Sequence, residues 1–272
     1  MERNEIQATK EGLRITELLS IQHLAYSFPG PVRTPVFSNL SMKVRRGEFI
    51  SVVGASGCGK STLFRMIAGL LEPGSGEIRL ALDGGTPGPQ RLGKVAYMPQ
   101  QDLLLPWRTA LDNCLLPLTL SRRNNKQEDA ARVSEMLRQF GLAGYEAAYP
   151  RELSGGMRQR VAFIRTLVTG SELMLLDEPF GALDALTKRE LHRWLLDLWG
   201  SLNKTVLFIT HDLEEALLLS DRIYLMAAGP EKDLEELTVE LPRPRTHTMN
   251  YEPRFIELRA QLERRLYESK II

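Results

Sequence analysis

The sequence has few cysteines, no long apolar run and almost no excess charge of either sign. Cys58 and Cys114 are its only thiols, too few for a disulfide framework or a four-cysteine zinc site, so we expect a reducing cytoplasm. No segment reaches the roughly eighteen apolar residues of a membrane-spanning helix. The charged residues 1–15 lack the apolar core of a signal peptide. A formal charge of +1 gives no reason to expect a nucleic-acid partner.

The order of the apolar segments predicts an α/β fold with a parallel sheet. Uniformly apolar or alternating runs indicate strands, and runs with helical spacing indicate helices. The predicted strands lie at 18–28, 36–44, 47–54, within 73–85, and at 94–100, 172–179, 205–210 and 222–229. The predicted helices lie at 60–71, 127–142, 154–170, 187–202, 213–220 and 254–268.

Two changes in composition divide the chain. Residues from about 102 to 152 hold helical pieces without a strong strand, which favours an all-helical insertion in an α/β core. A "PRPRTHT" stretch in the tail is typical of a linker. We therefore predict a main domain over residues 15–230 and a C-terminal extension over 231–272 that ends in a helix.

The segment "GASGCGKST" lies between a predicted strand and a predicted helix, and it matches the phosphate-binding pattern G-x-x-x-x-G-K-[ST]. Its glycines allow backbone N–H groups to converge on a phosphate, and the following helix adds its N-terminal dipole. Lys60 would reach the β- and γ-phosphate oxygens, and Ser61 would bind Mg²⁺. The alternative is a glycine-rich turn with an accidental lysine. The predicted nucleotide-binding residues here are Gly54, Ala55, Ser56, Gly57, Cys58, Gly59, Lys60, Ser61 and Thr62.

Cys58 lies inside this loop, beside backbone donors and a helix N-terminus. Such surroundings lower the pKa of a thiol. We therefore expect alkylation of Cys58 to block nucleotide binding, and bound nucleotide to protect the thiol.

Two carboxylates end the predicted strand "ELMLLDEP". Asp177 would hold Mg²⁺ through its water shell. Glu178 is unnecessary for holding the metal, and it is placed to accept a proton from water that attacks the γ-phosphate. A surface Asp-Glu pair is the alternative, although the apolar run before it indicates a buried strand.

Three further segments, "LSGGMRQR", "LLDEPFGALD" and "THD", follow in order along the chain. Together with the phosphate loop, they resemble the nucleotide-binding subunit of ABC transporters, from about Ile15 to the "RIYLM" strand. The resemblance implies a P-loop, RecA-like ATPase core with an antiparallel β subdomain and an inserted all-helical subdomain. It also implies ATP and Mg²⁺ as ligands and ATP hydrolysis coupled to transport across a membrane.

The resemblance suggests what the second glycine-rich segment binds. In the family, two such subunits pair head to tail with two ATP molecules between them. Ser154, Gly155 and Gly156 would then bind the γ-phosphate of the ATP held by a second copy of the chain. An ordinary helix cap explains Ser154 but not the two glycines after it.

Four other positions match family elements one at a time. Gln100 matches a glutamine that contacts magnesium, although Gln101 leaves the register open by one residue. Asp184 matches a residue of the dimer seam, and His211 matches a histidine that contacts the γ-phosphate. A lone histidine is more often structural, but the buried strand before His211 favours function.

Phe28 matches the aromatic residue that stacks on adenine, although Tyr26 is only two residues away. Either ring offers a π-face for stacking. A core aromatic residue is the alternative for this position.

The segment "QQDLLLPWRTALDNCLLPL" resembles importers of the nitrate, taurine, sulfonate and thiamine-precursor group. Residues near Gln100 to Trp107 would form a groove for an integral membrane permease subunit, and a substrate-binding protein would be an indirect partner. The chain would then lie at the cytoplasmic face of the membrane as a peripheral protein. The alternative is that Trp107 belongs to the core of the helical insertion.

Two other classes of protein remain open from the sequence. A non-transport ABC ATPase, such as an assembly or repair factor, generally has a long coiled-coil insertion or two ATPase units, and neither occurs here. A GTPase or small-molecule kinase would not explain "LSGG", and no guanine-reading "NKxD" sequence is present.

Overall fold

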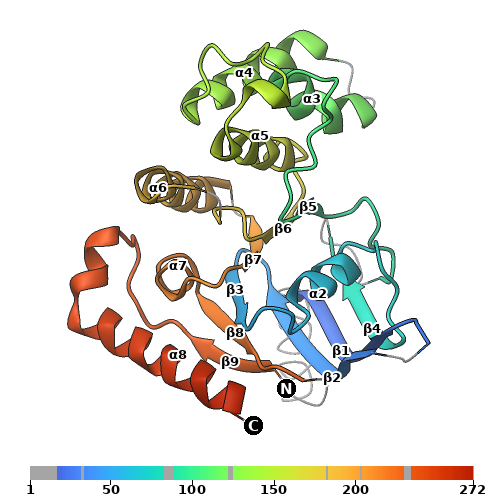
Figure 1. Ribbon diagram of the computed structural model, residues 1–272, viewed down its shortest axis with the longest axis vertical. Helices are drawn as coiled ribbons and strands as arrows, with labels where there is room; N and C mark the ends of the chain where they lie inside the picture. The colour runs from blue at the N-terminus through green and yellow to red at the C-terminus, as the bar shows by residue number, and fades with distance from the viewer. Residues whose placement is uncertain are drawn as a thin grey trace, which may run out of the picture.

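The computed structural model describes residues 17–31, 34–82, 88–121, 125–181, 183–202, 204–229 and 234–271. Two sheets lie below a separate helical body (Figure 1). The strands are β1 (Glu17–Phe28), β2 (Thr34–Arg45), β3 (Phe49–Gly54), β4 (Ser75–Leu80), β5 (Ala96–Met98), β6 (Leu173–Asp177), β7 (Thr205–Ile209), β8 (Arg222–Met226) and β9 (Leu234–Thr238). The helices are α2 (Lys60–Ile67), α3 (Ala110–Leu120), α4 (Lys126–Gln139), η1 (Pro150–Glu152), α5 (Gly155–Leu167), α6 (Ala185–Leu202), α7 (Leu213–Leu219), η2 (His247–Tyr251) and α8 (Pro253–Ile271).

The central sheet has six strands in the order β5-β6-β7-β3-β8-β9. All neighbours are parallel except β8 and β9. Strands β6, β7 and β8 are buried along their whole length, as their continuous apolar sequences predict for a sheet covered on both faces. Because carboxyl ends of parallel strands meet at one edge, Gly54, Asp177 and Ile209 bring their following loops together.

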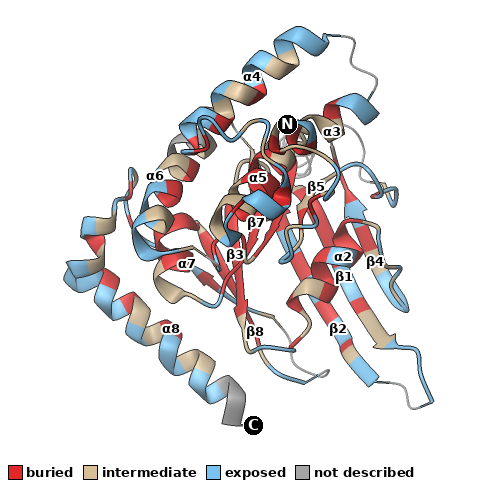
Figure 2. Ribbon diagram, turned by 45° about the horizontal axis from the view of Figure 1, so that its top comes forward, coloured by how far each residue is buried: buried red, intermediate tan, exposed pale blue. Residues whose placement is uncertain are grey.

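The smaller sheet is antiparallel, with the order β2-β1-β4. Its apolar face shares one buried cluster with α2 and the central sheet, including Leu24, Phe64 and Leu207. Buried residues continue from these strands into α2 (Figure 2). The helix that follows the phosphate loop is therefore packed between the two sheets.

The helical body consists of α3, α4 and α5 (Figure 1). Thr109 caps α3 by accepting a hydrogen bond from the Asp112 N–H, at 3.1 Å. Val133 of α4 and Phe163 of α5 belong to the same buried cluster. The helical packing therefore continues beyond the predicted limit at residue 152 and includes the helix that starts in "LSGG".

The predicted domain limit at residue 230 falls within the central sheet. Strand β9 lies beyond that limit and pairs with β8 along its whole length. The sequence did not suggest this strand because "LEELT" is mostly polar, and Leu237 is its only buried residue. Helix α8 then packs on α7 through Phe255 and Leu262, so the C-terminal extension shares a core with the main domain.

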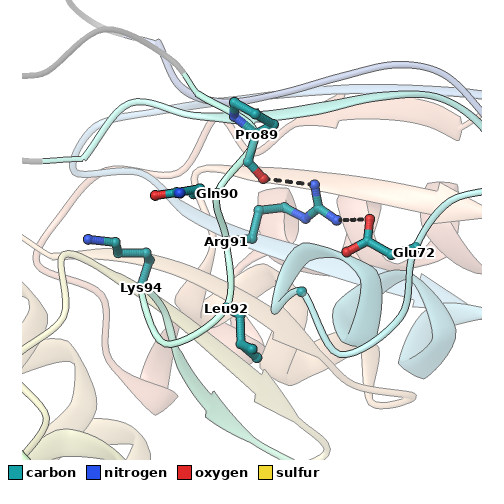
Figure 3. Close-up of a pocket in the computed structure, with 7 residues that line it drawn as sticks. Glu72, Pro89, Gln90, Arg91, Leu92 and Lys94 are labelled. Atoms are coloured by element: carbon teal, nitrogen blue, oxygen red, sulfur yellow. Dashed lines mark hydrogen bonds and ion pairs between the residues drawn. The ribbon is translucent and has the colours of Figure 1, made fainter.

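A pocket of about 610 Å³, lined by Glu72, Arg91 and Lys94 among others, lies beyond the carboxyl end of α2 (Figure 3). Lys60 is at the opposite end of this helix. Arg91 crosses this region and donates hydrogen bonds to Pro89 O, Met66 O and the Glu72 carboxylate, at 2.8–3.0 Å. These bonds join α2 to the segment that leads into β5. No helix in the described part of the chain is long and apolar enough to cross a membrane.

Candidate active site

The phosphate loop joins β3 to α2, and its shape depends on glycine. A Cβ on Gly54 would lie 2.3 Å from the Met226 carbonyl oxygen, which is closer than any side chain tolerates. Gly59 has φ of +107°, and a Cβ there would lie 2.7 Å from a methyl group of Val36. The loop therefore presents backbone rather than side chains at the N-terminus of α2, as an anion site requires.

Lys60 is the first residue of α2 and is almost completely buried. Its Nζ donates to the carbonyl oxygens of Gly54 and Ala55, at 2.9 Å in each case. The ammonium group is therefore held over the loop whose N–H groups would bind phosphate. A cation at this place is suited to a polyphosphate.

Asp177 and Ser61 form a hydrogen-bonded pair beside this loop. The Asp177 carboxylate is 2% exposed at the end of β6. Burial raises its pKa, and the negative charge of Glu178 acts in the same direction. A buried carboxylate and a hydroxyl are hard oxygen donors, the type of ligand that Mg²⁺ prefers.

Glu178 is at the meeting point of three loops. Its Oε2 accepts a hydrogen bond from Gln100 Nε2 at 3.1 Å and lies 3.5 Å from His211 Nδ1. Its backbone has φ of +47°, which is rare for a residue with a side chain. Gln159 of α5 donates to the Glu178 carbonyl oxygen at 3.2 Å, and so helps to hold this conformation.

The segment "LSGG" forms the start of α5, where Ser154 accepts a hydrogen bond from the Met157 N–H at 3.2 Å. A Cβ on Gly155 would meet only the end of Arg158, at 3.8 Å, whereas one on Gly156 would press on Leu183, at 3.1 Å. A hollow of about 410 Å³ separates this helix start from the loop at Gln100. Ser154 therefore caps α5, and the neighbouring Gly155 leaves the start of this helix open at the surface.

Asp184 lies at the start of α6 and caps that helix. Its carboxylate accepts hydrogen bonds from the Leu186 and Thr187 N–H groups, both at 3.1 Å, and from the Thr187 hydroxyl at 2.7 Å. The hydrogen bonds from Thr187 lower the pKa of Asp184. Asp184 therefore acts as the N-cap of α6, and its place at a dimer seam stays a prediction.

Phe28 ends β1 and is 41% exposed, which argues against a core role. It packs edge-on against Tyr26, with ring centroids 5.2 Å apart. The two candidate rings for adenine stacking are therefore in contact, and Phe28 is at the strand end.

The loop before α3 presents two apolar side chains at the surface. Trp107 is 70% exposed, so the alternative of a core tryptophan is wrong. Leu103 is also exposed and has φ of +43°. Asp102 of the same loop pairs with Arg158 of α5 at 3.0 Å, so this loop is joined to the helix that begins with Ser154.

The expectation of a lowered pKa for Cys58 is wrong. The thiol is only 8% exposed, and burial raises its pKa even though Lys60 Nζ lies 3.8 Å away. Desolvation of a thiolate outweighs the favourable charge and dipole here.

Alkylation of Cys58 should therefore be several-fold slower than that of an exposed thiol at pH 7, and should accelerate as pH rises, because the thiolate is the nucleophile. Mass spectrometry of iodoacetamide-treated protein would measure this, with bound ATP expected to slow labelling further. Cys58→Ser is the control, since Cys114 is buried and its pKa is raised to about 12. Rapid labelling at pH 7 would contradict the buried position of this thiol.

The family model described as "ABC transporter" matches residues 37–181. The chain belongs to the ABC transporter family. It is an ABC ATPase, and the resemblance and P-loop fold predicted from its motifs are confirmed. The GTPase and kinase alternatives are thereby excluded.

Relatives of this ABC ATPase carry names of import proteins. It is 40% identical to the formylaminopyrimidine import ATP-binding protein ThiZ of Halalkalibacterium halodurans, covering 94% of this chain and 99% of ThiZ. It is 41% identical to the nitrate import ATP-binding protein NrtD of Synechococcus elongatus, covering 90% of each. The dimeric post-hydrolysis structure of the ATP-binding cassette MJ0796, with ADP and phosphate bound, has a TM-score of 0.74 and 28% identity. That match covers 83% of this chain and all of the MJ0796 chain.

Sequence reasoning missed two residues that support this site. Gln159, which holds the Glu178 backbone, is inside the quoted "LSGGMRQR" segment and is nearly buried, so a polar residue on the inner face of the helix was an available signal. Glu215 is buried and accepts a hydrogen bond from the hydroxyl of Thr210, the residue before His211, and no local pattern distinguishes it from the half-buried Glu214 before it.

Proposed function

We propose that Glu178 is the general base for hydrolysis of ATP bound at the phosphate loop. The observation that carries this assignment is the convergence of Gln100 and His211 on the Glu178 carboxylate, next to the Asp177–Ser61 pair. A carboxylate held beside polar donors can accept a proton from water that attacks the γ-phosphate. Lys60 binds the β- and γ-phosphates, and His211 contacts the γ-phosphate.

The remaining residues of the site bind the nucleotide and its metal. Asp177, Ser61 and Gln100 would hold Mg²⁺, which would neutralise charge on the phosphates. The oxygen donors of Asp177 and Ser61, and the burial of the Asp177 carboxylate, fit this ion. Phe28 stacks on adenine, because its exposed ring at the end of β1 offers a free face.

Ser154, Gly155 and Gly156 act on the ATP of a second copy of the chain, in a head-to-tail dimer with Asp184 at the seam. The exposed start of α5 supports this assignment, because it combines a helix N-terminus with an uncrowded glycine. The dimeric state of MJ0796 gives it a precedent in a related fold.

We also propose that the ATPase energises an importer of a small solute at the cytoplasmic face of a membrane. The names of ThiZ, NrtD and the bicarbonate transport protein CmpD of Synechocystis sp., 39% identical over 93% of this chain, favour transport over assembly or repair. An integral membrane permease subunit binds the loop from Gln100 to Trp107, and a substrate-binding protein acts indirectly. The exposed Trp107 and Leu103 provide the apolar contact for the permease.

Trp107→Ala should weaken assembly with the permease by about 10-fold or more, because exposed tryptophans at interfaces contribute strongly to binding. The melting temperature and the ATPase rate of the isolated subunit should stay near those of the parent, since the ring is 70% exposed. Co-purification with the permease, or titration against it in detergent, measures the effect.

Tyr267→Ala is the matched control for this change. Tyr267 is 68% exposed on α8, far along the chain from the loop at Trp107, and its loss should leave assembly unchanged. If Trp107→Ala assembles with the permease as the parent does, Trp107 has no role in docking. A fall in stability of about 3–5 kcal/mol would instead indicate a core tryptophan.

A further inference from the structure

The C-terminal segment, residues 239–259, holds the carboxyl end of α7. Arg245 is 6% exposed, and its guanidinium donates hydrogen bonds to the carbonyl oxygens of Leu217, Ser220, Val239 and Leu241, at 2.5–3.2 Å. Leu217 and Ser220 are at the carboxyl end of α7, so the cation stabilises the negative end of this helix and joins it to the chain at Val239 and Leu241. The segment is therefore fixed to a helix whose other end adjoins His211.

The same segment also holds the amino end of α7. Arg259 Nη1 donates to Glu214 Oε1 at 2.6 Å, and Asn250 Nδ2 donates to Glu214 Oε2 at 2.9 Å. Glu214 is in the first turn of α7, only three residues after His211. Figure 1 shows α8 next to α7, on the side away from the helical body.

A buried carboxylate joins α7 to the loop of His211. Glu215 is 4% exposed, and it accepts hydrogen bonds from the Thr210 hydroxyl and from His192 Nε2, at 3.0 Å for His192. Lys188 Nζ lies 2.7 Å from the same carboxylate and also contacts Asp212, the N-cap of α7, at 3.0 Å. Burial would raise the pKa of Glu215, but these partners outweigh burial and lower it. The carboxylate is therefore ionised and fixes the residue before His211.

Two histidines continue this connection to the C-terminal segment. His247 stacks on His192, with ring centroids 5.3 Å apart and an angle of 20° between the planes. Burial lowers the pKa of His247 and the charge of nearby His192 acts in the same direction, while a hydrogen bond with the Arg189 backbone opposes the shift, so the neutral ring is favoured near pH 7. A neutral ring can cover His192 without adding repulsion, and His192 beneath it is only 3% exposed.

We propose that the C-terminal segment positions His211 for hydrolysis, because His247 covers His192, His192 orients Glu215, and Glu215 holds Thr210. The proposal rests on the assignment of His211 to the hydrolysis site above. His192 and His247 are positioning residues, because they act on His211 only through Glu215 and Thr210. If this series of contacts is interrupted, we expect the hydrolysis rate to fall while the affinity for the nucleotide stays the same.

The test compares His192→Phe with His192→Gln in the full-length chain. Phenylalanine keeps a ring but removes the donor to Glu215, whereas glutamine retains a side-chain N–H. We expect His192→Phe to lower kcat by about 10-fold with KM for ATP within about twofold, as for loss of one hydrogen bond to a charged group. His192→Gln should recover most of the rate, and His247→Ala should lower kcat less than His192→Phe does.

The outcomes separate this proposal from the assignment of the general base. Parent-like kcat in His192→Phe and His247→Ala would overturn the positioning role, as would equal losses in His192→Phe and His192→Gln. If His192→Phe does not fold, the His247→Ala variant provides the test, because His247 is only partly buried. The proposal then requires that His247→Ala lowers kcat without changing KM. Glu178→Gln is assayed in parallel. If Glu178→Gln is inactive while both histidine variants match the parent, only the positioning proposal fails.

Discussion

Glu178→Gln is expected to bind ATP as the parent does and to hydrolyse it about 10² to 10⁴ times more slowly, the usual range for loss of a general base. The amide has the same shape as the carboxylate but cannot accept the proton of the attacking water. In the parent, the Glu178 carboxylate lies 3.1 Å from Gln100 Nε2 and 3.5 Å from His211 Nδ1, and the substitution changes only this group. Steady-state phosphate release and equilibrium ATP binding measure the two quantities separately.

Glu190→Gln is the matched control, because it removes a carboxylate from the exposed surface of α6. It should leave both rate and binding unchanged. The parent rate in Glu178→Gln would show that another group takes the proton, and would remove the central assignment of the site.

Lys60→Ala should weaken ATP binding by about 100-fold, the upper part of the range for loss of a hydrogen bond to a charged group. The ammonium group already lies over the phosphate loop, bonded to Gly54 O and Ala55 O. Equilibrium binding of a fluorescent ATP analogue measures the loss, and a thermal melt checks that the loop still folds. Lys94→Ala, at the pocket beyond the other end of α2, should bind as the parent does. Parent-like affinity in Lys60→Ala would contradict the phosphate assignment.

The sequence predicted the strands and the helix that flank the phosphate loop and the Asp177-Glu178 pair, but not the contacts between distant segments around them. The phosphate loop and the Asp177-Glu178 pair could be placed from sequence because each follows a continuous buried strand. Adjacent parallel strands then bring their ends together. The family resemblance supplied Gln100 and His211 as candidate residues, but their convergence on the Glu178 carboxylate was not predicted and is seen only in the structure.

Contacts between distant segments decided the features that the sequence did not predict. From the loop sequence alone we predicted a lowered pKa for Cys58. The structure buries the thiol between α2 and its neighbours, and this burial raises the pKa instead. Strand β9 has little apolar content of its own, and forms because β8 offers an edge. His192 and His247 are far apart in the chain, and only the packing of the C-terminal segment brings their rings together.

The head-to-tail arrangement makes the sharpest prediction about a pair of chains. Glu178→Gln is placed in every chain so that bound ATP is trapped. One chain then carries Lys60→Ala and its partner carries Gly155→Glu. Gly155 has room for a side chain, since its Cβ would lie 3.8 Å from Arg158 Nη2, so the fold should tolerate the change. A carboxylate there would repel the γ-phosphate.

The decisive measurement is the amount of ATP occluded by this purified mixed dimer. If Ser154, Gly155 and Gly156 bind the ATP held by the partner, Lys60→Ala and Gly155→Glu affect the same site. The other site is then intact and should occlude one ATP per dimer. Each mutant homodimer should occlude none, which controls for leakage. If the mixed dimer is folded and binds nucleotide loosely but occludes no ATP, each chain's glycine segment serves its own nucleotide, and the head-to-tail account is contradicted.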